Sequence, residues 1–273
     1  MKFENVIIIG NGFDLNQHLP TSYSNFINST EFKQLLSTKN YFAEHLYRKH
    51  DLQNWIDVEN ELTLYSQGQS VQDAVNAFRE EFSIVSECLK KYLQTIDYST
   101  LNEEALSYKL IKENIDSEYL ILDFNYTETV AKILSTLGES DEQIKNRHIK
   151  VHGRLNTDVI FGVEDRARIK NEHVFLRKAY NKNFLAANLN SYLTESSIIH
   201  FFGHSLGASD HMYFDDFFST YSLKPYYKQG KEIHLYFYGE ESYNRIFMEM
   251  DELTNKQLSK FRQNNSLKFI NTM

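Results

Sequence analysis

The 273-residue sequence has few of the residues that break or constrain a chain, with 10 glycines, two prolines and one cysteine. A glycine share near 7% is usual, so this chain has roughly half of it. Left-handed backbone mostly needs glycine, so each remaining glycine indicates a position where the chain requires it. Six of the ten lie in four short motifs, at Gly10 and Gly12, Gly153, Gly162, and Gly203 and Gly207. We take this clustering as the first indication of a functional site.

The single cysteine and the short apolar runs exclude several classes of protein. Cys88 alone cannot form a disulfide within the chain or a cysteine-rich zinc site. The first apolar run, Val6 to Ile9, is too short for a secretory signal, and no run approaches the 18 residues of a membrane span. We therefore expect a cytoplasmic protein with no membrane partner.

The charge balance bears on the kind of ligand. The net charge is −8, whereas nucleic-acid binders usually carry a clustered basic face. Hydrophobic residues make up 41% of the chain and charged residues 24%, which is typical of a folded globular protein. The composition thus disfavours a nucleic-acid partner and leaves small molecules as the expected ligands.

Short apolar runs predict the strands of a mainly parallel sheet. They are nearly continuous rather than alternating, a pattern typical of strands buried on both faces. We predict strands at residues Val6–Ile9, Tyr119–Phe124, His148–His152, Val159–Phe161, Ser197–Phe202, Ile233–Tyr238 and Leu267–Ile270. Helical segments between them predict an α/β, Rossmann-like fold with helices on both faces of the sheet.

A long segment with helical periodicity separates the first two predicted strands. Apolar residues recur there every three or four positions, as in Trp55, Val58, Leu62 and Tyr65. It is too long for a simple crossover, so we predict a helical insertion at residues 20–116 within a single α/β domain spanning residues 1–273. Further helices are predicted at Glu128–Leu137, within Phe175–Leu193 and at Ser242–Phe261.

The first glycine motif directly follows the first predicted strand and reads Gly10-Asn11-Gly12-Phe13-Asp14. A strand that ends in Gly-x-Gly and leads into a helix lets backbone N–H groups approach a phosphate closely. The third glycine of the dinucleotide-binding motif is absent, because Leu15 occupies that position. A tight turn capped by Asp14 is the alternative.

Two further motifs also follow predicted strands. Asn125 offers a donor and an acceptor, which suits ribose hydroxyls or an attacking water, although a helix cap is an equal alternative. His152 precedes Gly153, and an imidazole titrating near 6.5 suits general acid–base chemistry. A purely structural histidine is the alternative. His148 and His152 would lie about 13 Å apart along a strand, so we expect no metal site there.

The fourth motif, Gly203-His204-Ser205-Leu206-Gly207, matches the Gly-x-Ser-x-Gly nucleophile elbow of α/β-hydrolases. Little chain follows Ser205, and no later histidine stands where that fold needs its base. We instead expect a turn facing phosphate or ribose, in which Ser205 donates a hydrogen bond and Asp210 caps the next helix or holds a ribose.

Together these motifs resemble the AbiH family, bacterial proteins linked to abortive phage infection. The resemblance implies a role in phage defence and no particular chemistry. It rests on Ile8 to Leu15, Leu19-Pro20-Thr21-Ser22-Tyr23, Trp55 with Glu59, Phe124-Asn125-Tyr126-Thr127, Val151-His152-Gly153, and Gly203 to Gly207 with Asp210.

A more distant resemblance to sirtuin-like NAD-binding domains implies a chemistry. In that scheme Gly10 and Gly12 hold a pyrophosphate, Asn125 orients the nicotinamide ribose or a water, and His152 is the acid–base residue. Gly203 with Ser205 matches the fourth turn of that scheme. From the motifs as a whole we expect the ligand-binding residues Gly10, Asn11, Gly12, Phe13, Gly153, Gly203, Ser205 and Asp210. The sequence departs from that scheme at Asn11 and at Tyr126-Thr127, and it lacks the cysteines of deacetylating sirtuins.

We therefore expect NAD or a related nucleotide as the ligand and hydrolysis of its N-glycosidic bond as the reaction, without a metal. Asn125 would position water, His152 would act as base and Asp14 would stabilise developing positive charge. A nucleotide sensor without turnover, a toxin directed at nucleic acid and a serine hydrolase using Ser205 are the alternatives. A second copy of the chain or another defence protein is an open alternative for a partner.

Overall fold

The computed structural model describes residues 3–49, 55–69, 71–157, 159–184, 189–223 and 230–273, and only the backbone of residues 55–57. The chain forms two compact units. The sheet unit comprises residues 1–18, 98–151 and 187–273, and the helical unit comprises residues 19–97 and 152–186. In the part that the structure describes, no helix is both long and apolar enough to span a bilayer.

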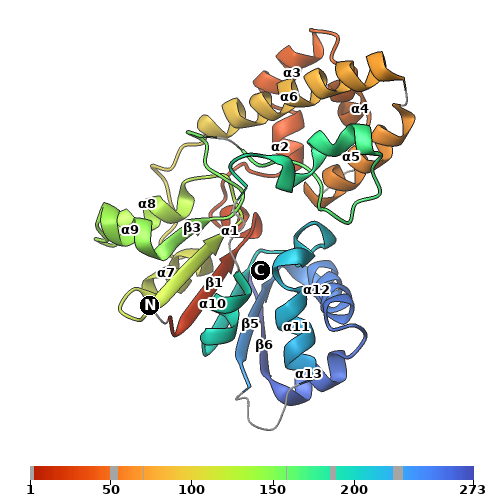
Figure 1. Ribbon diagram of the computed structural model, residues 1–273. Helices are drawn as coiled ribbons and strands as arrows, with labels where there is room; N and C mark the ends of the chain where they lie inside the picture. Colours follow the sequence, from red (N-terminus) through yellow and green to blue (C-terminus); the bar gives the residue numbers. More distant parts are fainter. Residues whose placement is uncertain (1–2, 50–54, 70, 158, 185–188, 224–229) are drawn as a thin grey trace. The chain divides into compact units, whose positions relative to one another are not determined.

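The sheet unit contains a six-stranded, entirely parallel sheet with strand order β3-β2-β1-β4-β5-β6 (Figure 1). This is the order of a doubly wound Rossmann fold, in which the sheet reverses its direction of growth between β1 and β4. The predicted α/β, Rossmann-like fold is confirmed. The strands are β1 (Asn5–Ile9), β2 (Tyr119–Asp123), β3 (His148–Lys150), β4 (Ile198–Phe202), β5 (Glu232–Phe237) and β6 (Ser266–Asn271).

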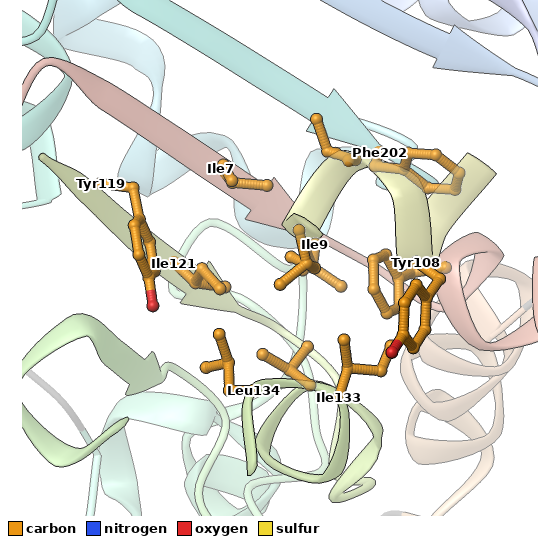
Figure 2. Packing of buried hydrophobic residues seen from close by; sticks show 12 residues of the cluster. Ile7, Ile9, Tyr108, Tyr119, Ile121, Ile133, Leu134 and Phe202 are labelled. Carbon is orange, nitrogen blue, oxygen red and sulfur yellow. The ribbon is translucent and has the colours of Figure 1, made fainter. Parts of the chain in front are cut away.

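Helices cover both faces of this sheet because its central strands are apolar on both sides. Every residue of β1 and β2 is buried. Ile7 and Ile9 pack on one face, with residues of α7 and α8 (Figure 2). Phe201 packs on the other face against Phe214 and Phe218. The helices of the unit are α1 (Gly12–Asn16), α7 (Leu106–Asn114), α8 (Thr129–Thr136), α9 (Asp141–Arg147), α10 (Leu189–Glu195), α11 (Asp215–Ser222), α12 (Gly239–Leu253) and α13 (Leu258–Asn264).

The helical unit is held together by an aromatic core. The Phe78 ring of α6 lies 5.2 Å from Phe42 and 4.9 Å from Tyr65. Side-chain caps begin three of its helices, since Ser22, Ser29 and Asn40 each accept a hydrogen bond from the backbone N–H three residues later. Its helices are α2 (Tyr23–Ile27), α3 (Thr30–Leu36), α4 (Tyr41–Arg48), α5 (Trp55–Gly68) and α6 (Gln72–Gln94), followed by 3-10 turns at Asn171–Leu176 and Lys178–Tyr180.

The boundaries of the helical unit differ from those of the predicted insertion at residues 20–116. Helix α7, which lies inside that range, belongs to the sheet unit, where Tyr108, Leu110 and Ile111 join its core. Residues 152–186, which follow β3, belong to the helical unit. A helical period shows that α7 is amphipathic, but it does not show which core receives the apolar face.

Three of the predicted elements are wrong in detail. Val159 forms only an isolated bridge with Gly153, because the chain turns back at Gly153 with φ +85° instead of extending into a strand. The helix predicted within Phe175–Leu193 is replaced by the two 3-10 turns and α10. The single helix predicted at Ser242–Phe261 is broken into α12 and α13, since Asn255 and Lys256 adopt positive φ.

Candidate functional site

The turns after β1 and β4 lie in direct backbone contact at the carboxyl edge of the sheet. The Gly10 N–H donates to the Phe202 carbonyl, and the Gly12 N–H donates to the Gly203 carbonyl, both at 3.0 Å. A Cβ at Gly203 would lie 2.4 Å from backbone atoms of Gly12 and Phe13, and Gly203 has φ +62°. Glycine is therefore required at these turns for close backbone packing. The expected role of Gly10 and Gly12 toward a phosphate stays a prediction.

The turn after β2 joins this pair through Asn125. The Asn125 Nδ2 donates to the Gly10 carbonyl at 3.1 Å, and the side chain is buried. The backbone of Asn125 is held on both sides, because its N–H donates to Asp123 Oδ1 at 2.9 Å and its carbonyl accepts from Lys150 Nζ at 3.0 Å. The structure thus brings three of the four predicted motifs together through hydrogen bonds within the sheet unit.

A buried ionic cluster fixes the turn that carries Asn125. Asp123 and Lys150 are register partners on β2 and β3, and Lys150 Nζ lies 2.8 Å from Asp123 Oδ2. The same oxygen lies 2.8 Å from His148 Nε2, and Lys150 also donates to the Thr127 carbonyl. Burial alone would raise the pKa of Asp123, but Lys150 and His148 outweigh burial and the pKa is lowered. The cluster therefore holds an ionised carboxylate beneath the turn.

Asp14 is the second buried carboxylate near this turn. It is fully buried, and its Oδ2 accepts a hydrogen bond from Thr127 Oγ1 at 2.7 Å, while Oδ1 has no hydrogen-bond partner in the part of the chain that the structure describes. Burial raises the pKa of Asp14 to about 6, against the opposing effect of the hydrogen bonds from Thr127 and Thr129. Asp14 therefore titrates near neutral pH and ties α1 to the Asn125 turn. Its expected role in stabilising developing positive charge stays a prediction.

The turn after β4 does not have the geometry of a nucleophile elbow. In that motif the serine itself occupies a strained strand-to-helix turn. Here the positive φ angles belong to Gly203 and Leu206, and Ser205 is an exposed residue whose Oγ accepts from the Gly207 N–H at 3.3 Å. A 3-10 turn, Ala208–Tyr213, follows and contains the buried Asp210. This geometry disfavours Ser205 as a nucleophile.

The remaining predicted residues lie in different surroundings. Asn11 and Gly12 are partly exposed, while the Phe13 ring is buried in the core, 5.5 Å from the Phe202 ring. Any contact of Phe13 with a ligand would have to come from its backbone. His152 and Gly153 belong to the helical unit, where the His152 carbonyl accepts from the Ile160 N–H at 2.9 Å. The base role of His152 therefore stays a prediction.

Glu59, which is part of the resemblance to AbiH proteins, also lies in the helical unit. Its Oε1 lies 2.9 Å from Nζ of Lys178, and the Lys178 side chain is 2% exposed. This ion pair gives Glu59 a structural role, because a buried ammonium needs a carboxylate or several carbonyls nearby. The Trp55 side chain lies outside the described part of the chain.

Sequence reasoning missed Asp123, His148 and Lys150 as members of the site. A signal was present, because each is a polar or charged residue within a predicted buried strand, and such residues are rarely buried without partners. Only the strand register, which aligns Asp123 with Lys150, identifies the partners. No group of three or more His, Cys, Asp or Glu side chains among the described residues could hold a metal ion.

Comparisons with known proteins identify the family. No curated protein and no solved structure matches the chain. A family model described as bacteriophage abortive infection AbiH matches residues 6–228, which include all four glycine motifs. This range covers well over half of the 273 residues. The chain therefore belongs to the AbiH family of bacteriophage abortive-infection proteins.

Proposed function

We propose that this abortive-infection protein binds NAD or a related nucleotide at the carboxyl edge of the sheet, beside the turns after β1, β2 and β4, and hydrolyses its N-glycosidic bond. One observation carries the proposal: these turns are joined by hydrogen bonds at the place where the sheet reverses direction. In open α/β sheets, ligands bind outside the carboxyl ends of the strands at this reversal point.

The chemistry of the side chains supports a nucleotide rather than an apolar ligand. Asn11 and Ser205 are accessible polar residues on the turns after β1 and β4. Amide and hydroxyl groups pair with ribose hydroxyls and phosphate oxygens. The ammonium of Lys150 is neutralised by Asp123, so these polar groups and the backbone would provide the recognition.

Hydrolysis of an N-glycosidic bond passes through an oxocarbenium-like state, which a nearby carboxylate stabilises and a positioned water attacks. We assign the positioning of water or a ribose hydroxyl to Asn125 and the electrostatic role to Asp14, which carries a negative charge above about pH 6. His152 is assigned as the base. Because Asp14 is fully buried, it would not contact the ribose. It would act through the electrostatic field of its carboxylate and by holding the Asn125 turn in place.

Nucleotide sensing without turnover is the second candidate function. The burial of Asp14 favours it, and so does the use of the Asn125 amide in a hydrogen bond to Gly10. A sensor needs the same recognition groups but no group that activates water.

Incubation of the purified protein with NAD, followed by chromatographic measurement of nicotinamide release, tests the proposal. We expect release by the wild type and a loss of at least about 100-fold in Asn125→Ala and His152→Ala, in line with the usual contribution of a positioned catalytic group. Asn146→Ala on α9 is the matched control, because Asn146 is exposed. Thermal unfolding of each variant checks its fold.

The same variants should be compared in a phage challenge with cellular NAD measured in parallel. We expect Asn146→Ala to protect cells and to lower NAD as the wild type does, and Asn125→Ala to do neither. NAD binding without nicotinamide release would contradict hydrolysis and would support nucleotide sensing as the function. Absence of both binding and release, or protection that persists in both catalytic variants, would overturn the proposed function.

A further inference from the structure

Strand β6 lies at the end of the sheet, so one side of its backbone has no neighbouring strand among the described residues. It pairs with β5 alone. The Ser266 N–H donates to the Lys231 carbonyl at 2.8 Å. The Thr272 N–H, just past the end of the strand, donates to the Phe237 carbonyl, also at 2.8 Å. Because backbone groups alternate between the two sides of a strand, the even-numbered residues of β6 bond to β5 and the odd-numbered residues point away from it.

The outward-pointing residues of β6 are Leu267, Phe269 and Asn271. Their N–H and carbonyl groups lie along the open edge, and no other strand of the described chain pairs with them. A row of such groups is a template for pairing with another chain. The edge is therefore a candidate interaction surface, and the side chains of β6 determine which partner fits it.

The one charged residue of β6 does not block this edge. Edge strands often carry a lysine that discourages pairing with other chains. Here Nζ of Lys268 lies 2.5 Å from Oε1 of Glu232 on β5, and the same oxygen lies 2.7 Å from Nε2 of His234. The ammonium is thus paired within its own sheet.

The other side chains at the edge are mostly apolar. The Phe269 ring stacks on the Phe247 ring of α12 at 4.9 Å and lies 5.4 Å from the Tyr243 ring. These three rings are only partly buried, as are Leu267 and Ile270. Aromatic residues are enriched in protein interfaces. The open edge therefore offers backbone hydrogen bonds together with apolar area, which favours a protein strand as its partner.

We propose that β6 pairs antiparallel with β6 of a second copy of this chain, so that the two sheets continue into one another. A two-fold axis places the same strand on both sides of such an interface. With the axis at Phe269, this residue faces Phe269 of the partner subunit, and Leu267 faces Asn271 of the partner subunit. All the outward-pointing residues are then paired, and each pair exchanges two N–H···O=C bonds.

The charge of Lys268 selects this register. On the other face of the joined sheet, Lys268 faces Ile270 of the partner subunit. An axis at Lys268 would instead set this residue against Lys268 of the partner subunit, and like charges directly opposite are destabilising. An axis at Ile270 would leave Leu267 facing no residue of β6. The edge is therefore complementary to itself, which is why we assign it to a second copy.

The pairing is independent of the family match and of the proposed function. Strand β6 lies beyond residue 228, where the match to the family ends, so family membership does not imply this contact. No residue proposed to act on a nucleotide lies on β6.

Sedimentation velocity of the full chain, from about 1 to 200 µM, tests the pairing. We expect a reversible monomer–dimer equilibrium, because pairing through one short strand is at the small end of protein interfaces. Ile270→Glu and Ile270→Lys are a matched pair, since both remove the same partly buried side chain. A carboxylate at this position attracts Lys268 of the partner subunit, whereas an ammonium repels it. The dissociation constant of Ile270→Lys should exceed that of Ile270→Glu by about tenfold. Thermal unfolding checks the fold of each variant.

Hydrogen exchange of the wild type, read at single amides by mass spectrometry with electron-transfer fragmentation, tests the pairing without any substitution. At the highest concentration, the amides of Leu267, Phe269 and Asn271 should exchange about tenfold more slowly than at the lowest. The amides of Lys268 and Ile270, which bond to β5, should be equally protected at both concentrations.

Three results would overturn the inference. A wild type that stays monomeric over the whole range would refute self-pairing. Dimers in which the outward-pointing amides gain no protection would form through another surface and would refute it as well. Equal dissociation constants for the two Ile270 variants would refute the register centred on Phe269. None of these measurements involves NAD, so failure of the proposed function would leave the pairing unaffected.

Discussion

At the scale of single residues, Asn125 owes its position to groups on three strands. Its side chain donates to Gly10 after β1, and its backbone is held by Asp123 of β2 and Lys150 of β3. A side chain whose backbone is fixed on both sides loses little further entropy when it binds a ligand. This preorganisation is what a residue that positions water or a ribose hydroxyl requires.

Asp14 carries a pH-dependent cost in stability. Its pKa is raised to about 6 in the folded state from 3.8, so the folded protein binds more protons between these values than the unfolded chain does. Stability therefore falls as the pH rises through these two values, by about 3 kcal/mol in total for this group alone once the pH is above both of them. We expect Asp14→Asn to remove this dependence and to raise the free energy of unfolding at pH 7.5 by about 1–3 kcal/mol.

Urea unfolding at pH 4, 5, 6 and 7.5 measures this effect, and Asp116→Asn, at an exposed carboxylate, is the control. If hydrolysis needs the charge of Asp14, the Asn variant should be more stable and less active. A variant that is less stable than the wild type at pH 7.5 would show that the folded protein favours the ionised carboxylate.

At the scale of elements, the carboxyl edge depends on strands that carry charge inside an apolar sheet. Lys150 on β3 binds Asp123 on β2 and the carbonyls of Asn125 and Thr127. Burying a charge pair is costly by itself. The pair stabilises the local geometry here, because the ammonium donates hydrogen bonds to the carbonyls of a turn that has no regular secondary structure.

Lys150→Met should be strongly destabilising, because it leaves the buried carboxylate of Asp123 with His148 as its only titratable partner on β3. We expect a loss of about 3–5 kcal/mol in the free energy of unfolding, together with faster amide exchange at Asn125. Lys145→Met on α9 should change stability by less than about 0.5 kcal/mol, because Lys145 is exposed. Equal unfolding midpoints for the two variants in urea would contradict the structural role of the cluster.

At the scale of the whole molecule, the family-matched segment and the folded sheet do not coincide. The match ends at residue 228, yet β5 and β6 complete the sheet after that point, and β5 pairs along the whole of β4. The Phe261 ring of α13 stacks on Phe218 of α11 at 4.9 Å, so the added helices also complete the core. The turn after β4 is therefore supported by elements outside the matched range.

Truncation after residue 228 should give an insoluble or aggregated protein. It removes β5 and uncovers the edge of β4, a mostly apolar strand of five residues that can then pair with other chains. Size-exclusion chromatography of the expressed protein measures the outcome. A truncation after residue 271, which removes only Thr272 and Met273, is the control and should elute as the full chain does. A folded, soluble protein ending at residue 228 would show that β5 and β6 are dispensable.

Much of the sheet could be predicted from the sequence, because a buried strand is a local property. Six of the seven predicted strands are present, since each is a short apolar run bounded by polar residues or glycine. Val159–Phe161 has the same composition, but in the described part of the chain it forms an isolated bridge between Val159 and Gly153 instead of a strand. Three apolar residues do not by themselves determine whether a neighbouring strand is available.

The contacts of the site could be predicted only in part. The turns at Gly10, Asn125 and Gly203 were expected at one edge of a parallel sheet, because consecutive parallel strands end on the same side. The hydrogen bonds among them and the pairing of Asp123 with Lys150 could not be expected from spacing along the chain.

The sequence by itself determined most of the segments that form strands and helices, that the sheet is mainly parallel, and where glycine-dependent turns occur, because hydrophobic period and backbone preference act over a few residues. Only the tertiary structure decided that Gly10, Asn125 and Gly203 touch, that Lys150 meets Asp123, and that His152 belongs to the helical unit. These outcomes depend on strand order and register, and the residues involved are up to roughly two hundred positions apart. Their interaction energies exist only after the sheet has formed.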